Sequence, residues 1–239
     1  MRLFVCGALL LLLAGPALSV GKAALDPQLT GRGWMEIRFD GKMPNAFLSC
    51  GDSCIKVISM DSVSMISKEY PVQLSDTPLL SWQWMLGQPA ARSDLTKKGQ
   101  DDRAVAVYVA FPYDSKNASL AEVLFRPFVE LAKGENAPGR VISYVFWGGG
   151  DAKRGKFVKS PYLGGHGVTK IVRNADDKPR SWIFERVNVV EYYKKFFGDL
   201  PNSVSHILIS PDSDDTGVES MAYVRKIAFH PLSARKPEN

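Results

Sequence analysis

The sequence has few of the residues that build common catalytic centres, with only three cysteines and three histidines among 239 residues. The serine-hydrolase elbow G-x-S-x-G, the phosphate-binding P-loop and the dinucleotide-binding G-x-G-x-x-G do not occur in it. The sequence therefore does not indicate a serine hydrolase, a P-loop nucleotidase or a dinucleotide-dependent enzyme. The histidines are isolated from one another, and a lone histidine has no neighbour that would identify it as a base or a metal ligand.

A concentrated basic surface is also missing. The formal net charge is +5, and removal of residues 1–19, which contain one arginine and no acid, leaves +4. Basic residues are scattered, apart from the short groups at 153–156 and 194–195. Nucleic-acid binding requires a clustered basic face, so we predict no nucleic-acid partner.

The N-terminus has the pattern of a secretory signal peptide. Arg2 precedes an unbroken apolar run over residues 3–14, a Gly-Pro pair ends the run, and small residues follow. The run is too short to span a bilayer comfortably, and no later segment is apolar enough to do so. We predict cleavage after Ser19, with a second candidate site after Ala23. The mature chain is then periplasmic or secreted and has no membrane span.

Two cysteines, Cys50 and Cys54, remain after that cleavage. An oxidising compartment favours a disulfide between them, and Gly51 supplies the turn that so short a loop needs. A redox pair or half of a zinc site are the alternatives. A redox pair usually has two intervening residues, and a zinc site needs further ligands.

Most of the mature chain has the residue pattern of β-strands. Side chains alternate along a strand, which puts Leu80, Trp82 and Trp84 on one apolar face. Segments 104–111 and 141–147 are apolar on both faces, as is typical of central strands. Further strands are predicted at 35–39, 54–58, 62–67, 78–85, 168–173, 181–186, 206–210 and 221–229.

Two segments, 120–133 and 189–197, have helical spacing, and the second ends at Gly198 with lysines in its last turn. About ten short strands with two short helices predict a mainly β fold, an antiparallel β-sandwich of jelly-roll type. The predicted organisation is a signal peptide at 1–19, an N-terminal extension at 20–33, a single β-sandwich domain at 34–230 and a flexible tail at 231–239.

Acidic residues gather at the ends of two predicted strands. Asp212, Asp214 and Asp215 follow the strand at 206–210, and Asp101 and Asp102 precede the strand at 104–111. If these strands are antiparallel neighbours, the acids share one edge of the sandwich. Carboxylates there can bind a cation such as calcium, or accept hydrogen bonds from sugar hydroxyls. The same residue types also form ordinary turns, which stays the leading alternative.

Other candidate ligand-binding residues lie outside this acidic edge. Arg103 adjoins the Asp pair, Trp147 precedes a glycine-rich loop, and His166 lies in another. An aromatic ring at a loop mouth can stack on a ligand, although core packing is the alternative for Trp147. Glu185 and Arg186 end a strand, where Glu185 can act with a second carboxylate as in glycosidases, or form a salt bridge.

Several blocks in the same order resemble a family of exported bacterial proteins without an assigned function, the domain-of-unknown-function family numbered 3047. The blocks are Thr77–Trp84, Asp101–Arg103 with Val105, Tyr108 and Phe111, Ile142–Trp147, Ser160–Tyr162, Glu185–Val189 with Tyr192 and Phe197–Gly198, and Ser210–Gly217. Ser210–Pro211 and Asp215 depart from the family pattern without removing the acidic turn. The resemblance implies export and a β-sandwich, and it implies no enzyme activity.

Three functions are compatible with these features. The first is a non-enzymatic exported β-sandwich that binds a carbohydrate or similar polar ligand at the acidic edge, with a bound calcium ion as an option. The second is a glycan-active hydrolase with two of the carboxylates as acid and base. The third is a structural or assembly module of the cell envelope that uses an exposed sheet face.

Overall fold

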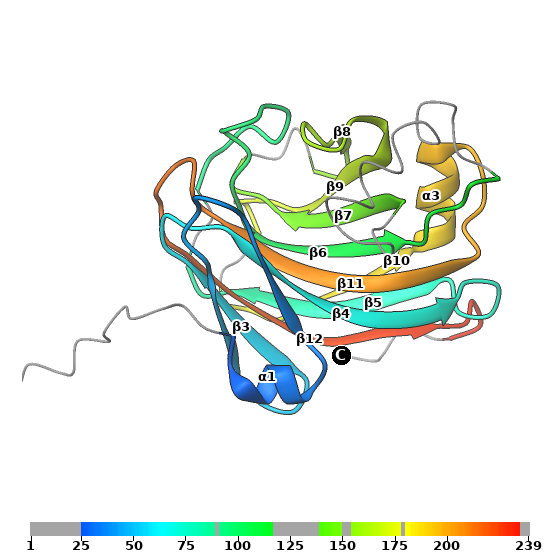
Figure 1. Cartoon of the computed structure of the whole chain (residues 1–239), viewed down its shortest axis with the longest axis horizontal. Coiled ribbons are helices and arrows are strands. Elements are labelled where there is room, and N and C mark those ends of the chain that lie inside the picture. Colours follow the sequence, from blue (N-terminus) through cyan, green and yellow to red (C-terminus); the bar gives the residue numbers. More distant parts are fainter. Residues whose placement is uncertain (1–24, 89–90, 117–138, 150–153, 178–179, 235–239) are drawn as a thin grey trace, which may run out of the picture.

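The computed structural model describes residues 25–88, 91–116, 139–149, 154–177 and 180–234. These residues form two β-sheets that pack face to face, with one large apolar core between them (Figure 1). The predicted fold class, a mainly β sandwich with few helices, is confirmed.

One sheet has seven strands and the other has five. The seven-stranded sheet contains, in spatial order, β1 (Met35–Arg38), β4 (Ser64–Gln73), β11 (Ser203–Asp212), β6 (Arg103–Phe111), β7 (Arg140–Phe146), β9 (Gly167–Arg173) and β8 (Phe157–Lys159). The five-stranded sheet contains β10 (Ile183–Asn188), β5 (Leu79–Leu86), β12 (Ser220–His230), β3 (Cys54–Ser59) and β2 (Ala46–Ser49). Neighbours are antiparallel except β7 and β9, which are parallel.

All ten strands predicted from the sequence overlap observed strands. The structure adds β2 and β8, which are four and three residues long and form the outer edges of their sheets. Strands this short contain too few alternating positions to be recognised from residue pattern alone.

The core between the sheets is built around aromatic side chains. Trp82 and Trp84 on β5 are fully buried, and their rings meet edge to face at 5.2 Å. Tyr144 and Phe146, on β7 of the opposite sheet, pack against these two tryptophans at 5.4 and 5.5 Å respectively. The predicted inward face of β5 is therefore confirmed.

Strand β6 is buried on both faces, as its sequence predicts. Val105, Val107 and Val109 face the main core, whereas Ala106 belongs to a second apolar cluster. That cluster, which covers the outer surface of the seven-stranded sheet, consists of Leu95, Ala106, Val145, Trp147 and Ile171.

The predicted helix at 189–197 is observed as α3 (Val189–Phe197), which packs at one end of the layers (Figure 1). The side chain of Asn188 accepts a hydrogen bond from the Glu191 N–H at the N-terminus, and Gly198 ends the helix in the left-handed conformation. The helix predicted at 120–133 lies outside the described residues.

The N-terminal part of the described chain contains a short helix that the sequence pattern did not predict. This helix, α1 (Pro27–Gly31), is capped by Asp26, and its Leu29 is fully buried in the core. Residues 25–33 thus pack against the sandwich, and Leu25 pairs with Phe47 of β2. No helix among the described residues is long and apolar enough to cross a membrane.

Cys50 and Cys54 form the predicted disulfide, with their Cα atoms 4.9 Å apart. Gly51 within the loop has a φ of 127°, a conformation that favours glycine. The Cys54 N–H donates to the Gly51 carbonyl, so the disulfide closes a tight turn before β3.

Because the loop is so short, we expect a modest effect when both cysteines are replaced by alanine. The chain-entropy relation for a loop of this length gives a loss of about 2 kcal/mol in the free energy of unfolding. Urea unfolding followed by tryptophan fluorescence measures it. Loss of a cooperative unfolding transition would instead mean that the disulfide is required for the whole fold.

Candidate functional site

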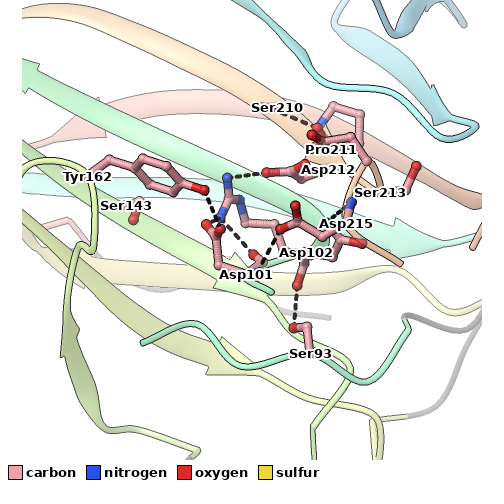
Figure 2. A network of polar contacts seen from close by, with 12 residues as sticks. Ser93, Asp101, Asp102, Ser143, Tyr162, Ser210, Pro211, Asp212, Ser213 and Asp215 are labelled. Atoms are coloured by element: carbon pink, nitrogen blue, oxygen red, sulfur yellow. Dashed lines mark hydrogen bonds and ion pairs between the residues drawn. The ribbon is translucent and has the colours of Figure 1, made fainter. Parts of the chain in front are cut away.

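The two acidic segments predicted to share an edge meet in the structure. Strands β11 and β6 are antiparallel neighbours, and their register pairs Asp212, at the end of β11, with Arg103, at the start of β6. A register shift between Ser210 and Asp212 marks an irregularity at this point. We call the five aspartates gathered here the acidic rim; it consists of Asp101, Asp102, Asp212, Asp214 and Asp215. Figure 2 labels all of them except Asp214.

Arg103 links the two segments through its guanidinium group. Its Nη1 donates to the Asp101 carboxylate at 2.8 Å and to the Asp101 carbonyl at 2.9 Å, and its Nη2 donates to Asp212 Oδ2 at 2.5 Å. The three side chains are at most 16% exposed. Charged groups this deeply buried require compensation, so Arg103 is primarily a counter-ion for two buried carboxylates.

Asp102 holds the turn that follows β11. Its Oδ2 accepts hydrogen bonds from the Thr216 N–H at 2.8 Å and the Thr216 hydroxyl at 2.5 Å, and its Oδ1 accepts from the Asp215 N–H at 3.2 Å. In return, Asp215 Oδ2 accepts the Asp101 N–H at 3.0 Å. The turn and the start of β6 are therefore bonded reciprocally.

A buried network of small polar residues fixes the base of the same turn. The Ser213 N–H donates to the Ser62 carbonyl at 3.1 Å, and the Ser213 and Ser59 hydroxyls are 2.7 Å apart. The Asn45 amide donates to the Pro211 carbonyl at 3.0 Å. These bonds anchor the turn to β3 and to the chain around it, so the carboxylates of the rim are held in defined positions.

The pKa of Asp212 is raised and that of Asp214 is lowered, although their carboxyl groups are in contact. Burial raises the pKa of Asp212 to about 8, against the attraction of Arg103, and the charges of Asp214 and Asp102 raise it further. Burial alone would also raise the pKa of Asp214, but its contacts with Asp212 and Lys42 hold it below the ordinary value. Lys42 pairs with Asp214 from the exposed turn between β1 and β2.

The carboxylates that converge most closely are Asp102, Asp212 and Asp214, with one oxygen from each lying within 4.8 Å of the others. The sequence suggested Asp212, Asp214 and Asp215 as the cation-binding set. The structure brings Asp102 to this point, whereas Asp215 turns towards the backbone of Asp101.

Trp147, a candidate ligand-stacking residue, is 4% exposed and belongs to the second apolar cluster. Its Nε1 donates to the Ser93 hydroxyl at 2.8 Å. That hydroxyl donates to the Asp102 carbonyl at 2.5 Å (Figure 2). Gly149 lies against the Trp147 ring, where an added Cβ would come within 2.0 Å. Trp147 therefore supports the rim through Ser93, and its covered ring is not available for stacking on a ligand.

Tyr162 is the residue at the rim that the sequence did not identify as a candidate. It is 57% exposed, and its hydroxyl donates to Asp101 Oδ1 at 3.0 Å (Figure 2). The same hydroxyl accepts the Gly99 N–H at 3.3 Å, and Lys98 Nζ lies 5.5 Å from the ring centre. Nothing in the local pattern at 160–162 points to the rim, because Tyr162 comes from a loop 61 positions away from Asp101.

The remaining candidates lie apart from these contacts. His166, in the turn η2 (Gly164–His166), is half-buried, and its N–H donates to the Leu163 carbonyl. Arg186 is half-buried, and its Nη1 donates to the Ala234 carbonyl at 2.9 Å.

Glu185 faces the core and takes part in a separate ion-pair cluster. It accepts hydrogen bonds from Trp84 Nε1 at 3.0 Å and from Arg173 Nε at 2.5 Å. Burial raises its pKa, although Arg173 and Trp84 oppose this effect. Adjacent side chains of a strand point to opposite faces, so Glu185 pairs with Arg173 of the other sheet rather than with Arg186.

Comparison with solved structures finds similar two-layer β folds at low identity. The xyloglucanase domain of NopAA from Sinorhizobium fredii, in complex with cellobiose, is 8% identical; the match covers 84% of this chain and 94% of that domain, with a TM-score of 0.46. The family 11 carbohydrate-binding module from Clostridium thermocellum, in complex with a mixed-linked tetrasaccharide, is 8% identical, with coverage of 83% and 89% and a TM-score of 0.40. A family 12 xyloglucanase from Bacillus licheniformis is 11% identical, with coverage of 83% and 87% and a TM-score of 0.41.

Comparison at the sequence level finds no match among curated proteins. Residues 32–228 match the family described as "Protein of unknown function (DUF3047)". This range covers most of the chain and includes the whole acidic rim, as the resemblance of the sequence blocks predicted. The chain belongs to the DUF3047 family.

Proposed function

We propose that this chain is an exported, non-enzymatic β-sandwich that binds a carbohydrate at the acidic rim. The observation that carries the proposal is the exposed ring of Tyr162 beside the rim, where its hydroxyl is held by Asp101. Export rests on the apolar N-terminal segment of the sequence.

The chemistry at this surface suits a sugar. One face of a pyranose ring is apolar and can stack on an aromatic ring, whereas its hydroxyl groups donate hydrogen bonds to carboxylates. Tyr162 supplies the ring, and the half-buried Asp214 and Asp215 supply carboxylates at the same surface. The reciprocal bonds around Asp102 hold these groups in place before a ligand arrives, which lowers the entropic cost of binding.

The geometry favours binding over hydrolysis. A glycosidase needs two carboxyl groups about 5–9.5 Å apart on either side of the scissile bond. Oxygens of Asp212 and Asp214 are closer than this, within 4.8 Å, and Asp212 is only 6% exposed. Glu185 is buried and held by Arg173 and Trp84, so it does not supply a free second carboxylate.

Tyr162→Ala tests the proposal because it removes the ring but leaves the aspartates. We expect a loss of affinity of about fivefold or more for whichever sugar binds, because stacking on an aromatic ring contributes about 1 kcal/mol or more. Calorimetric titration of the purified exported chain measures it, with a panel that includes cellobiose and mixed-linked β-glucan oligosaccharides.

Tyr162→Phe is the matched control, since it keeps the ring and loses only the hydroxyl that Asp101 accepts. It is expected to retain most of the affinity. Equal affinity of the alanine variant and the unaltered chain would rule out Tyr162 as the stacking platform. The absence of any heat across the panel at millimolar concentration would contradict carbohydrate binding at this rim.

A further inference from the structure

One carboxylate oxygen of the rim is buried without a hydrogen-bond donor. Asp212 is 6% exposed, and its Oδ1 accepts no hydrogen bond from an amide, hydroxyl or cationic group of the described residues, although its carboxyl group contacts that of Asp214. Its other oxygen, Oδ2, is occupied by Arg103. Buried carboxylate oxygens are normally satisfied by a donor or a cation, so Oδ1 points to a missing partner.

The missing partner is positively charged, because the groups around Asp212 are acidic. Its carboxyl contacts that of Asp214, and two ionised carboxylates have only acceptor atoms to offer one another. Asp102 contributes a third oxygen at the same point. Convergence of three carboxylates on one another is unfavourable unless a proton or a metal cation lies between them.

The charges present at the rim leave an excess of negative charge. Five aspartates gather there and two cations pair with them, Arg103 and Lys42, so three negative charges remain when all five carboxyl groups are ionised. Arg103 is directed at Asp101 and Asp212 Oδ2, and Lys42 reaches only Asp214. Neither cation satisfies Asp212 Oδ1.

We propose that Asp102, Asp212 and Asp214 bind a calcium ion. Calcium takes oxygen ligands at 2.3–2.6 Å, so two ligands on opposite sides of it are at most about 5 Å apart. The three carboxylate oxygens, which lie within 4.8 Å of one another, meet this limit. Calcium also tolerates the irregular ligand geometry that a turn provides, and water can complete its coordination. Zinc, in contrast, prefers nitrogen and sulfur ligands.

Binding of calcium requires Lys42 to give way. Its side chain is 47% exposed and comes from a surface turn, so its ammonium group can move into solvent at little cost. The ion would then join Asp102, before β6, to Asp212 at the end of β11 and Asp214 in the turn after it, in addition to the hydrogen bonds already described. This inference shares Asp214 with the proposed carbohydrate site, but its test is separate, since calcium titration uses no sugar and does not involve Tyr162.

Calorimetric titration of calcium chloride into the chelator-treated exported chain tests the proposal. We expect one calcium per chain and a rise in melting temperature, because a ligand that binds only the native state stabilises it. Asp212→Asn and Asp214→Asn each remove one charged ligand with little change in shape, and each is expected to weaken calcium binding at least tenfold. Asp76→Asn, in the exposed turn between β4 and β5, is the matched control and is expected to bind as the unaltered chain does.

A variant that is expected to bind calcium more tightly distinguishes loss of the site from loss of the fold. Lys42→Met removes the competing ammonium group and is expected to bind calcium several-fold more tightly, a gain that a damaged fold would not produce. The proposal is overturned if the unaltered chain binds no calcium at millimolar concentration. It is equally overturned if Asp212→Asn and Asp214→Asn bind calcium as tightly as Asp76→Asn does.

Discussion

Replacing Arg103 with methionine is expected to lower the free energy of unfolding by about 3–5 kcal/mol. The substitution keeps much of the side-chain volume but leaves the buried carboxylates of Asp101 and Asp212 without their shared counter-ion. Removing one partner of a buried ion pair costs more than the pair itself contributes, because the remaining charge stays out of water. Urea unfolding at pH 9, above the pKa of about 8 at which Asp212 loses its proton, measures the change.

An ion pair with an exposed arginine, on the same sheet, provides the control. Arg38 pairs with Glu36 on β1, and the Arg38 side chain is 57% exposed. Arg38→Met is therefore expected to cost less than about 1 kcal/mol. Similar losses in the free energy of unfolding for the two variants would show that burial of Arg103 and its partners does not increase their contribution to stability.

A double variant tests the origin of the Arg103 effect. Combining Arg103→Met with Asp212→Asn removes the charge of one stranded carboxylate, so part of the lost stability is expected to return. For two residues in direct contact, the effects of the two substitutions on the free energy of unfolding are expected to differ from their sum by about 0.5–3 kcal/mol. Strict additivity of the two substitutions would mean that Arg103 does not act through Asp212.

Asp212 is expected to make the calcium-free protein less stable as the pH rises. Its pKa is about 8 in the folded protein, above the ordinary value of 3.8, so the folded state binds this proton more tightly than the unfolded state. The resulting stabilisation is fully present below about pH 4 and is lost as the pH rises through about 8. The groups that face Asp212 are Arg103, Asp214, Asp102 and Tyr108, and Arg103 opposes the shift.

Asp212→Asn imitates the protonated form at every pH. Its amide N–H can donate to Asp214, and its carbonyl can still accept from Arg103. In the presence of chelator, we expect the variant to be more stable than the unaltered chain at pH 8 by about 3 kcal/mol, roughly half the value that the full pKa shift implies. Urea unfolding between pH 5 and pH 9 measures the difference.

The contribution of Asp212 is the difference between the two stability profiles, since other titrating groups are common to both chains. The expected difference grows as the pH rises. Parallel profiles would show that Asp212 is already ionised in the folded protein at pH 5. In excess calcium the order at pH 8 is expected to reverse, because only the unaltered chain retains all three carboxylates at the proposed site.

Local sequence patterns determined much of the fold. Alternating or continuous apolar runs located ten strands. Alternation also predicted the inward face of Trp82 and Trp84, since side chains two positions apart in a strand point to the same face. The bounds of α3 follow from its terminal glycine and apolar spacing, and the Cys50–Cys54 disulfide from a four-residue separation. Each of these features depends on interactions within a few residues.

The partners of the functional side chains were decided by tertiary structure alone. Arg103 and Asp212 are 109 positions apart, and their pairing depends on the register of β6 against β11, including the irregularity before Asp212. The same register brings Asp102, instead of Asp215, to the point where carboxylates converge. The sequence by itself determined that acids would end these two strands, because strand ends need turn-forming residues. Which oxygens meet, and which is left without a donor, is set by contacts across the sheet that no local pattern encodes.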